Sequence, residues 1–220
     1  MRRRQGGAEL PATVVDPVIT VAPDSATTTT TTWTPPKSCE ETVEALQGGE
    51  SPSADVNLVD LADRNQLAPL PVPGAEAAAV TDRQAFASRE DYITLVALDD
   101  PMQRFNDLGT AGFTRGLQVD MELGPDSYEI IVMELGSPEQ AMQYRTAHLR
   151  QACARADGMQ EMPALPGGAV FYRSDTNAAR ATIVLGRYEL NLEICECVEV
   201  VDRLALAEEW AAAIVADLET

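Results

Sequence analysis

The chain has 220 residues, a formal net charge of −19 and a sequence pI near 4.2. A surface this acidic repels phosphate groups, so we expect neither a nucleic-acid partner nor binding to an anionic membrane surface. No run approaches the roughly 20 apolar residues of a membrane span, so the sequence predicts no transmembrane segment in this chain. The length suits one ordinary domain with an N-terminal appendage.

The first 37 residues have the composition of a tail and not of a folded domain. Arg2 to Arg4 look like the charged start of a signal peptide, but no apolar run of about 7–15 residues follows them. Thr27 to Thr32, followed by Trp33-Thr34-Pro35-Pro36, is typical of the Thr/Pro stalks that separate extracellular domains from an anchor. We therefore predict a disordered tail with a Thr/Pro-rich linker over 1–37 and an extracytoplasmic or cell-surface location, with the anchor or signal missing from this chain. The alternative is a cytoplasmic protein with a disordered tail.

The N-terminal part of the folded region has a weak pattern. Ser38 and Glu41 have capping-box spacing, which predicts a short helix with Cys39 in its first turn. After Gly48-Gly49 there is only partial helical spacing, a proline-rich stretch and an alanine-rich stretch. We expect 38–97 to be a helical or irregular appendage, and 98–220 to be the core domain.

From Asp99 onward the pattern becomes clear. Asp99 or Asp100 can cap a helix that Pro101 begins, and Ser137-Pro138-Glu139-Gln140 predicts a second helix reaching about Ala156. A last helix is predicted over Val201 to Leu218. Strands are predicted between these helices, with alternating or continuous apolar residues, at Leu117 to Leu123, Tyr128 to Leu135 and Ala169 to Arg173.

A β-hairpin is predicted over Ala181 to Ile194. Gly186-Arg187 is a two-residue connection with glycine first, as a type II′ turn requires. In the second strand, Tyr188, Leu190, Leu192 and Ile194 alternate with Glu189, Asn191 and Glu193, which predicts one face in the core and the other in water. Tyr128 to Glu134 echoes Tyr188 to Ile194, each preceded by a strand and followed by a helix. We therefore expect an α+β fold, an antiparallel β-sheet with helices packed mainly on one face, built from two β-β-α units.

The four cysteines, Cys39, Cys153, Cys195 and Cys197, suggest two disulfides. A bridge from Cys195 to Cys197 would close a very small, strained ring, so the preferred pairings join Cys39 and Cys153 each to one of Cys195 and Cys197. A thiolate metal site is the rival interpretation, but zinc wants four ligands and the chain has one histidine, His148. Free buried thiols are the third interpretation of the four cysteines.

No catalytic, cofactor-binding or metal-binding set is predicted. The sequence lacks G-x-S-x-G, H-E-x-x-H and a glycine-rich nucleotide loop. His148 lies in an apolar stripe of its helix with no carboxylate four residues away, so we expect a packed histidine.

Several short motifs in the core domain resemble secreted or lipid-anchored actinobacterial domains, both uncharacterised lipoproteins and the extracellular sensor domains of some receptor kinases. These motifs are Gly112-Phe113 with Gly116, Ser137-Pro138-Glu139-Gln140-Ala141, Leu165-Pro166-Gly167 and Gly186-Arg187-Tyr188. The resemblance covers roughly Leu98 to Leu218 and implies an exported, non-catalytic domain with a ligand cleft. The chain departs from it by lacking a lipobox cysteine after a signal peptide.

The sequence therefore predicts a non-catalytic sensor or binding module of the cell envelope, with a small molecule or a protein as partner. A pocket of aromatic side chains would favour binding, and the candidates are Tyr128, Phe171, Tyr172 and Trp210. A structural envelope protein is one alternative. An enzyme is another, in which two of the 35 acidic residues would converge in a cleft.

Overall fold

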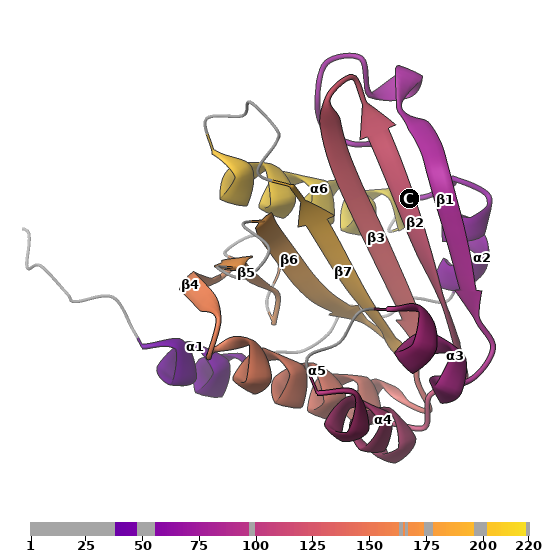
Figure 1. Cartoon of the computed structure of the whole chain (residues 1–220). Coiled ribbons are helices and arrows are strands. Elements are labelled where there is room, and N and C mark those ends of the chain that lie inside the picture. The colour runs from indigo at the N-terminus through magenta and orange to yellow at the C-terminus, as the bar shows by residue number, and fades with distance from the viewer. Residues whose placement is uncertain are drawn as a thin grey trace, which may run out of the picture. The chain divides into compact units, whose positions relative to one another are not determined.

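The architecture is that of a seven-stranded antiparallel sheet with helices on both faces (Figure 1). The computed structural model describes residues 38–47, 56–96, 100–162, 165, 167–173, 178–195 and 202–218. The predicted tail over 1–37, Gly48-Gly49 and Cys197 lie outside the described residues. Within these ranges the strands run in the order β1-β2-β3-β7-β6-β5-β4, and their bounds are β1 (Ala79–Phe86), β2 (Arg115–Leu123), β3 (Asp126–Glu134), β4 (Ala156–Glu161), β5 (Ala169–Arg173), β6 (Ala178–Leu185) and β7 (Tyr188–Ile194).

The helices divide between the two faces of the sheet. The α6 face carries Ile130, Val132, Leu190 and Leu192 and is covered by α2 and α6. The opposite face, here called the α5 face, carries Ile131 and Met133 and is covered by α3, α4 and α5, with α1 against the end of α5. The bounds are α1 (Cys39–Leu46), α2 (Leu58–Asp63), a 3-10 turn η1 (Ala75–Ala77), α3 (Arg89–Leu95), α4 (Pro101–Thr110), α5 (Pro138–Ala152) and α6 (Arg203–Leu218).

The predicted α+β class and antiparallel sheet are confirmed, but helices packed mainly on one face are not observed. The correction has a simple cause: both sets of alternating residues on the central strands β3 and β7 are buried, so each face needs its own cover. Three of the predicted helix starts are confirmed, whereas the last helix begins at Arg203 and the predicted start at Val201 lies outside the described residues. Ser38 forms the capping box with Glu41, Asp100 caps α4 and Ser137 caps α5, each through a side-chain oxygen that accepts a backbone N–H.

The hairpin of β6 and β7 forms as predicted. Leu185 pairs with Tyr188 around the turn, and Gly186 has the positive φ of 56° that its position requires. The echoing segments of β3 and β7 pair with each other, and their central residues, Ile131 and Asn191, are direct partners. A local two-fold axis therefore relates the two central strands, although α5 and α6 that follow them pack on opposite faces.

Two strands were absent from the sequence prediction. Ala79–Phe86, within the segment expected to be irregular or helical, forms β1 at one edge of the sheet. Ala156–Glu161 forms β4 at the other edge, so α5 ends at Ala152 and not at about Ala156. Residues 36–220 group as one compact unit, in which the appendage predicted over 38–97 supplies part of the sheet and part of the core.

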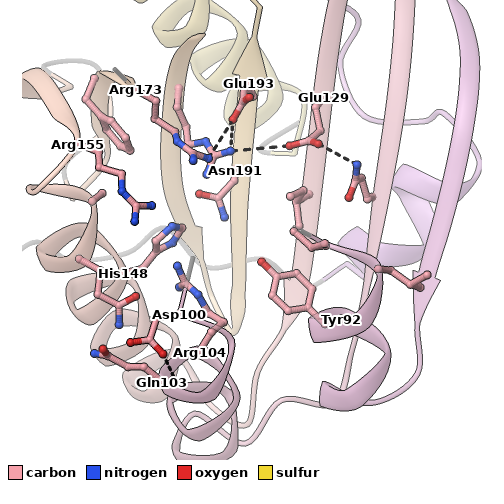
Figure 2. Close-up of a pocket in the computed structure, with 18 residues that line it drawn as sticks. Tyr92, Asp100, Gln103, Arg104, Glu129, His148, Arg155, Arg173, Asn191 and Glu193 are labelled. Atoms are coloured by element: carbon pink, nitrogen blue, oxygen red, sulfur yellow. Dashed lines mark hydrogen bonds and ion pairs between the residues drawn. The ribbon is translucent and has the colours of Figure 1, made fainter. Parts of the chain in front are cut away.

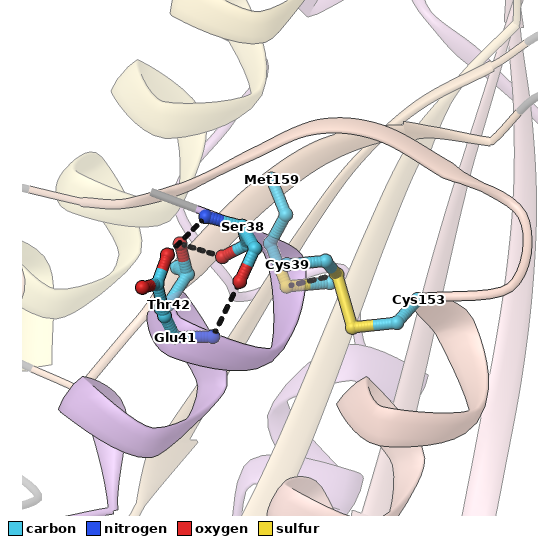
Figure 3. Close-up of a disulfide and its surroundings, with 6 residues drawn as sticks. All are labelled: Ser38, Cys39, Glu41, Thr42, Cys153 and Met159. Carbon is cyan, nitrogen blue, oxygen red and sulfur yellow. Dashed lines mark hydrogen bonds between the residues drawn. A yellow bond between two sulfur atoms is a disulfide. The ribbon is translucent and has the colours of Figure 1, made fainter. Parts of the chain in front are cut away.

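The predicted cysteine pairing is wrong. Cys39 forms a disulfide with Cys153, with their Cα atoms 5.6 Å apart (Figure 3). The physical reason is that α1 packs against α5 and β4, which brings the first turn of α1 to the C-cap of α5. The Sγ of Cys39 also lies 3.5 Å from Sδ of Met159, a van der Waals contact because a disulfide sulfur carries no hydrogen. Cys195 is disulfide-bonded as well, so neither bond formed by Cys39 or Cys153 reaches the β6–β7 hairpin.

Candidate functional site

A pocket of about 480 Å³ opens on the α5 face, between the sheet and the helices that cover it (Figure 2). Its floor comes from β2, β3, β5, β6 and β7. One wall comes from the last turns of α5, where His148, Gln151 and Ala152 lie, and continues to Arg155. The other comes from the end of α3 and the start of α4, with Tyr92, Gln103 and Arg104. Its volume is that of an ordinary small-molecule site.

The floor of the pocket is a charged row that crosses four strands, β3, β7, β6 and β5. Glu129 of β3 faces Glu193 of β7, which in turn faces Arg180 of β6. The Nη2 atom of Arg180 donates to Glu193 and lies 3.9 Å from Oε1 of Glu129, and Nη1 of Arg173 lies 3.7 Å from Oε2 of Glu193. Burial, and then the negative charge of Glu193, raise the pKa of Glu129 to about 7. Glu129 therefore exchanges its proton near neutral pH.

A row of amides lies beside these charges. Gln118 of β2 donates through Nε2 to Oε2 of Glu129 at 2.8 Å and to Oδ1 of Asp120 at 3.0 Å. The hydroxyl of Thr182 donates to Oδ1 of Asn191 at 2.7 Å. The carbonyl oxygen of Gln118 and the NH₂ group of Asn191 keep their capacity to bond a ligand.

His148 of the pocket wall forms a buried polar pair with Glu189, which lies behind it. The Nδ1 atom of His148 lies 2.8 Å from Oε1 of Glu189, whose side chain is fully buried on β7. Burial and the positive charge of Arg104 lower the pKa of His148 to about 4, against the opposite effect of Glu189. At neutral pH the ring is uncharged; with an ionised carboxylate as partner, Nδ1 carries the hydrogen and Nε2 is left as an acceptor.

Arg104 brings a positive charge to the helical wall. Its Nη1 donates to the hydroxyl of Tyr144 at 3.0 Å, and its guanidinium lies 5.6 Å from the centre of that ring. Among the described residues no carboxylate pairs with it within salt-bridge distance. Figure 2 shows Arg104 and Arg155 on either side of the His148 ring. All three side chains line the same pocket.

The aromatic residues predicted to form a pocket are not brought together. Phe171 lines the pocket, from β5. Tyr128 and Trp210 pack edge to face in the core of the α6 face, with ring centres 6.3 Å apart, on the other side of the sheet. Tyr172 alternates with Phe171 along β5 and does not line the pocket. The prediction fails for three of the four because they lie on the wrong face of their strands or helix.

The polar residues that do form the site were missed for one reason. Glu189, Asn191 and Glu193 were expected to face water, yet Glu189 and Asn191 are buried and Glu193 faces the pocket. One feature of the sequence could have indicated the site. Arg180 and Thr182 alternate along β6 as Asn191 and Glu193 alternate along β7, so pairing of these two hairpin strands places the four polar side chains on the same face of the sheet. His148 was correctly expected to be packed, but its partner comes from β7, 41 residues along the chain.

The described residues contain no cluster of three or more histidine, cysteine or acidic side chains suited to holding a metal ion. None of the helices in the same ranges is both long and apolar enough to cross a bilayer.

No protein-family model matches this chain, and no curated protein matches it in sequence. Among solved structures, the chain is similar to the extracellular domain of PknH from Mycobacterium tuberculosis, with 12% sequence identity and a TM-score of 0.44. The similar region covers 68% of this chain and 93% of that chain.

Proposed function

We propose that this protein is a non-catalytic small-molecule-binding domain that works outside the cytoplasm. The observation that carries the proposal is the pocket on the α5 face, where charged and amide side chains from five strands and two helices converge. Ligand sites combine a concave surface with a few polar groups held by rigid elements, and here the polar groups stand on central strands of the sheet.

A purely structural role in the cell envelope, the first alternative, explains the pocket less well. Burying an ion costs several kcal/mol, and apolar residues of similar volume often give equal or greater stability. Glu129 and Glu193 also face each other directly, and like charges in opposed positions destabilise a sheet. Such costs are expected where side chains are kept for binding.

The disulfides support the extracytoplasmic part of the proposal. Cys39 and Cys153 are bonded to each other, and Cys195 is also disulfide-bonded. Disulfides persist in oxidising compartments and are rare in the reducing cytosol. Thiol titration of denatured protein from its native host, with and without reductant, tests this: four free thiols before reduction would contradict it.

The binding role is tested by filling the pocket. Ala152 lines it from α5, whereas Ala154 is exposed two residues further on. We expect at least one compound of a broad metabolite library to raise the Tm of the full chain and of Ala154→Trp, but not of Ala152→Trp. If every stabilising compound acts equally on Ala152→Trp, the pocket is not the binding site and the proposal fails.

A second candidate, an acid–base enzyme, is favoured by one specific observation. The pocket holds two opposed carboxyl groups, Glu129 and Glu193, with the pKa of Glu129 at about 7, close to that of a general acid or base at neutral pH. The two candidates differ in the fate of the bound compound. Mass spectrometry of the ligand after long incubation with protein shows an unchanged mass for a binding domain, and a changed mass that depends on Glu129 for an enzyme.

A further inference from the structure

The floor of the pocket carries two carboxyl groups and two guanidinium groups. Glu129 and Glu193 provide two negative groups, and Arg173 and Arg180 provide two positive groups within 3.9 Å of them. The row carries no net charge when Glu129 is ionised and one positive charge when Glu129 is protonated, as it is in part of the molecules near its pKa of about 7. The row therefore does not repel an anion in either state, and the helical walls decide where an anionic group can bind.

The lining of the helical walls includes two guanidinium groups and one carboxylate. Arg104 and Arg155 contribute two cationic groups, while Asp100 contributes one carboxylate, which accepts the backbone N–H of Gln103 as the cap of α4. Arg104 donates to the neutral hydroxyl of Tyr144 and has no ion-pair partner among the described residues. In a chain with net charge −19, this concentration of guanidinium groups at a cavity is a specific feature. Arginine is suited to binding the oxygens of carboxylates and phosphates.

The rest of the lining favours hydroxyl groups. Gln151 donates through Nε2 to Asp107 at 2.7 Å, which leaves its carbonyl oxygen as an acceptor, like that of Gln118. Asn191 keeps its NH₂ donors, and Nε2 of His148 is an acceptor. A hydroxyl both donates and accepts, so a ligand with several hydroxyls can match this mixture of fixed donors and acceptors.

We propose that the pocket binds a small polyhydroxylated anion of the sugar-phosphate or sugar-acid class. Its anionic oxygens lie between Arg104 and Arg155, and its hydroxyls bond the amides of the floor and His148. This assignment rests on the proposed binding function. A volume of about 480 Å³ is ample for one sugar ring with a charged substituent.

Isothermal titration calorimetry of the full chain tests the assignment with four probes: glucose 6-phosphate, glucuronate, glucose and inorganic phosphate. We expect one or both sugar anions to bind at least about tenfold more tightly than either glucose or inorganic phosphate. Glucose offers no anionic group to the arginines, and inorganic phosphate offers no sugar hydroxyls to the amides and His148. The two sugar anions separate a phosphate from a carboxylate as the preferred charged group.

Two variants locate the anion. Arg104→Gln removes the guanidinium from the pocket, and we expect about 10- to 100-fold weaker binding of the sugar anion. Arg150→Gln removes the same charge from an exposed position of α5 and is expected to change affinity less than about threefold. Arg155→Gln serves the same purpose as Arg104→Gln if that variant does not fold.

Each outcome decides the inference. If glucose binds as tightly as the sugar anions, the ligand does not need an anionic group. If inorganic phosphate binds as tightly, the ligand does not need hydroxyl groups. If neither sugar anion binds, both parts of the assignment are wrong. Equal losses in Arg104→Gln and Arg150→Gln overturn the placement of the anion. If a library compound of another class stabilises the protein and Ala152→Trp abolishes that effect, the binding function stands and only the ligand class is wrong.

Discussion

Replacing Glu129 by glutamine should change how stability depends on pH. The folded-state pKa of about 7 lies above the ordinary value of 4.5, so between these pH values the folded protein holds a proton that the unfolded chain releases. The stabilisation from this proton is fully present below about pH 4.5 and is lost as pH rises through 7. A shift of this size corresponds to about 3 kcal/mol.

His148 changes the stability with pH in the opposite direction to Glu129, over nearly the same pH range. Its pKa falls from 6.5 to about 4 on folding, so the stability that it contributes is present above pH 6.5 and is lost as pH falls through 4. The two slopes, each about 1.4 kcal/mol per pH unit, nearly cancel between pH 4.5 and 6.5. We therefore expect these two groups to give the unmodified protein a nearly flat profile in this interval.

Of these two contributions to the pH dependence of stability, only that of His148 remains in Glu129→Gln. The free energy of unfolding should rise with pH by about 3 kcal/mol from pH 4 to 6.5, and at pH 8 the variant should be more stable than the unmodified protein by up to about 3 kcal/mol. The side-chain carbonyl of the introduced glutamine can still accept the hydrogen bond from Gln118, which limits the loss of contacts. Urea unfolding at half-unit pH steps measures both quantities.

The matched control is Glu122→Gln, the same change at an exposed position of β2, which should leave the profile unaltered. A Glu129→Gln profile parallel to that of the unmodified protein, or lower stability of this variant at pH 8, would refute the assigned electrostatics of the pocket floor.

Two further predictions concern the disulfide and the histidine. The bond between Cys39 and Cys153 spans 114 residues of sequence, so chain entropy predicts that the double alanine variant loses about 5 kcal/mol in urea unfolding; a loss below about 1 kcal/mol would contradict this. In Glu189→Gln the carboxylate that supports protonation of His148 is gone, so the pKa of His148 should fall further below about 4. The chain has one histidine, so proton NMR follows a single ring through the titration, and an upward shift would be inconsistent with the observed pair.

Local patterns allowed much of the fold to be predicted. The caps at Ser38 and Ser137 and the turn at Gly186 depend on residues within a few positions of one another, and the sequence shows these directly. The edge strand β1 has no such signature because only Phe86 of its eight residues is buried. Its place in the sheet comes from backbone pairing with β2, and backbone pairing leaves little trace in side-chain composition.

The candidate site could not be predicted because its parts meet only in the folded chain. An alternation such as that of β7 usually marks a strand with one face in water. Here α5 covers the polar face, and the buried Glu189 meets His148 of that helix. The cysteine pairing failed for the same reason, since the contact between α1 and α5 joins segments more than a hundred residues apart.

The α5 face of the sheet changes from apolar to polar along the central strands, and the pocket lies at the polar end. At one end, Met133 of β3 and Val184 of β6 pack with Phe86 and Leu108 into a hydrophobic cluster. At the other end, Glu129, Arg180 and Glu193 cannot support such a cluster, because each buried polar group needs a partner. One end of the face is thus filled by core, and the other is left as a polar cavity that a small ligand can occupy.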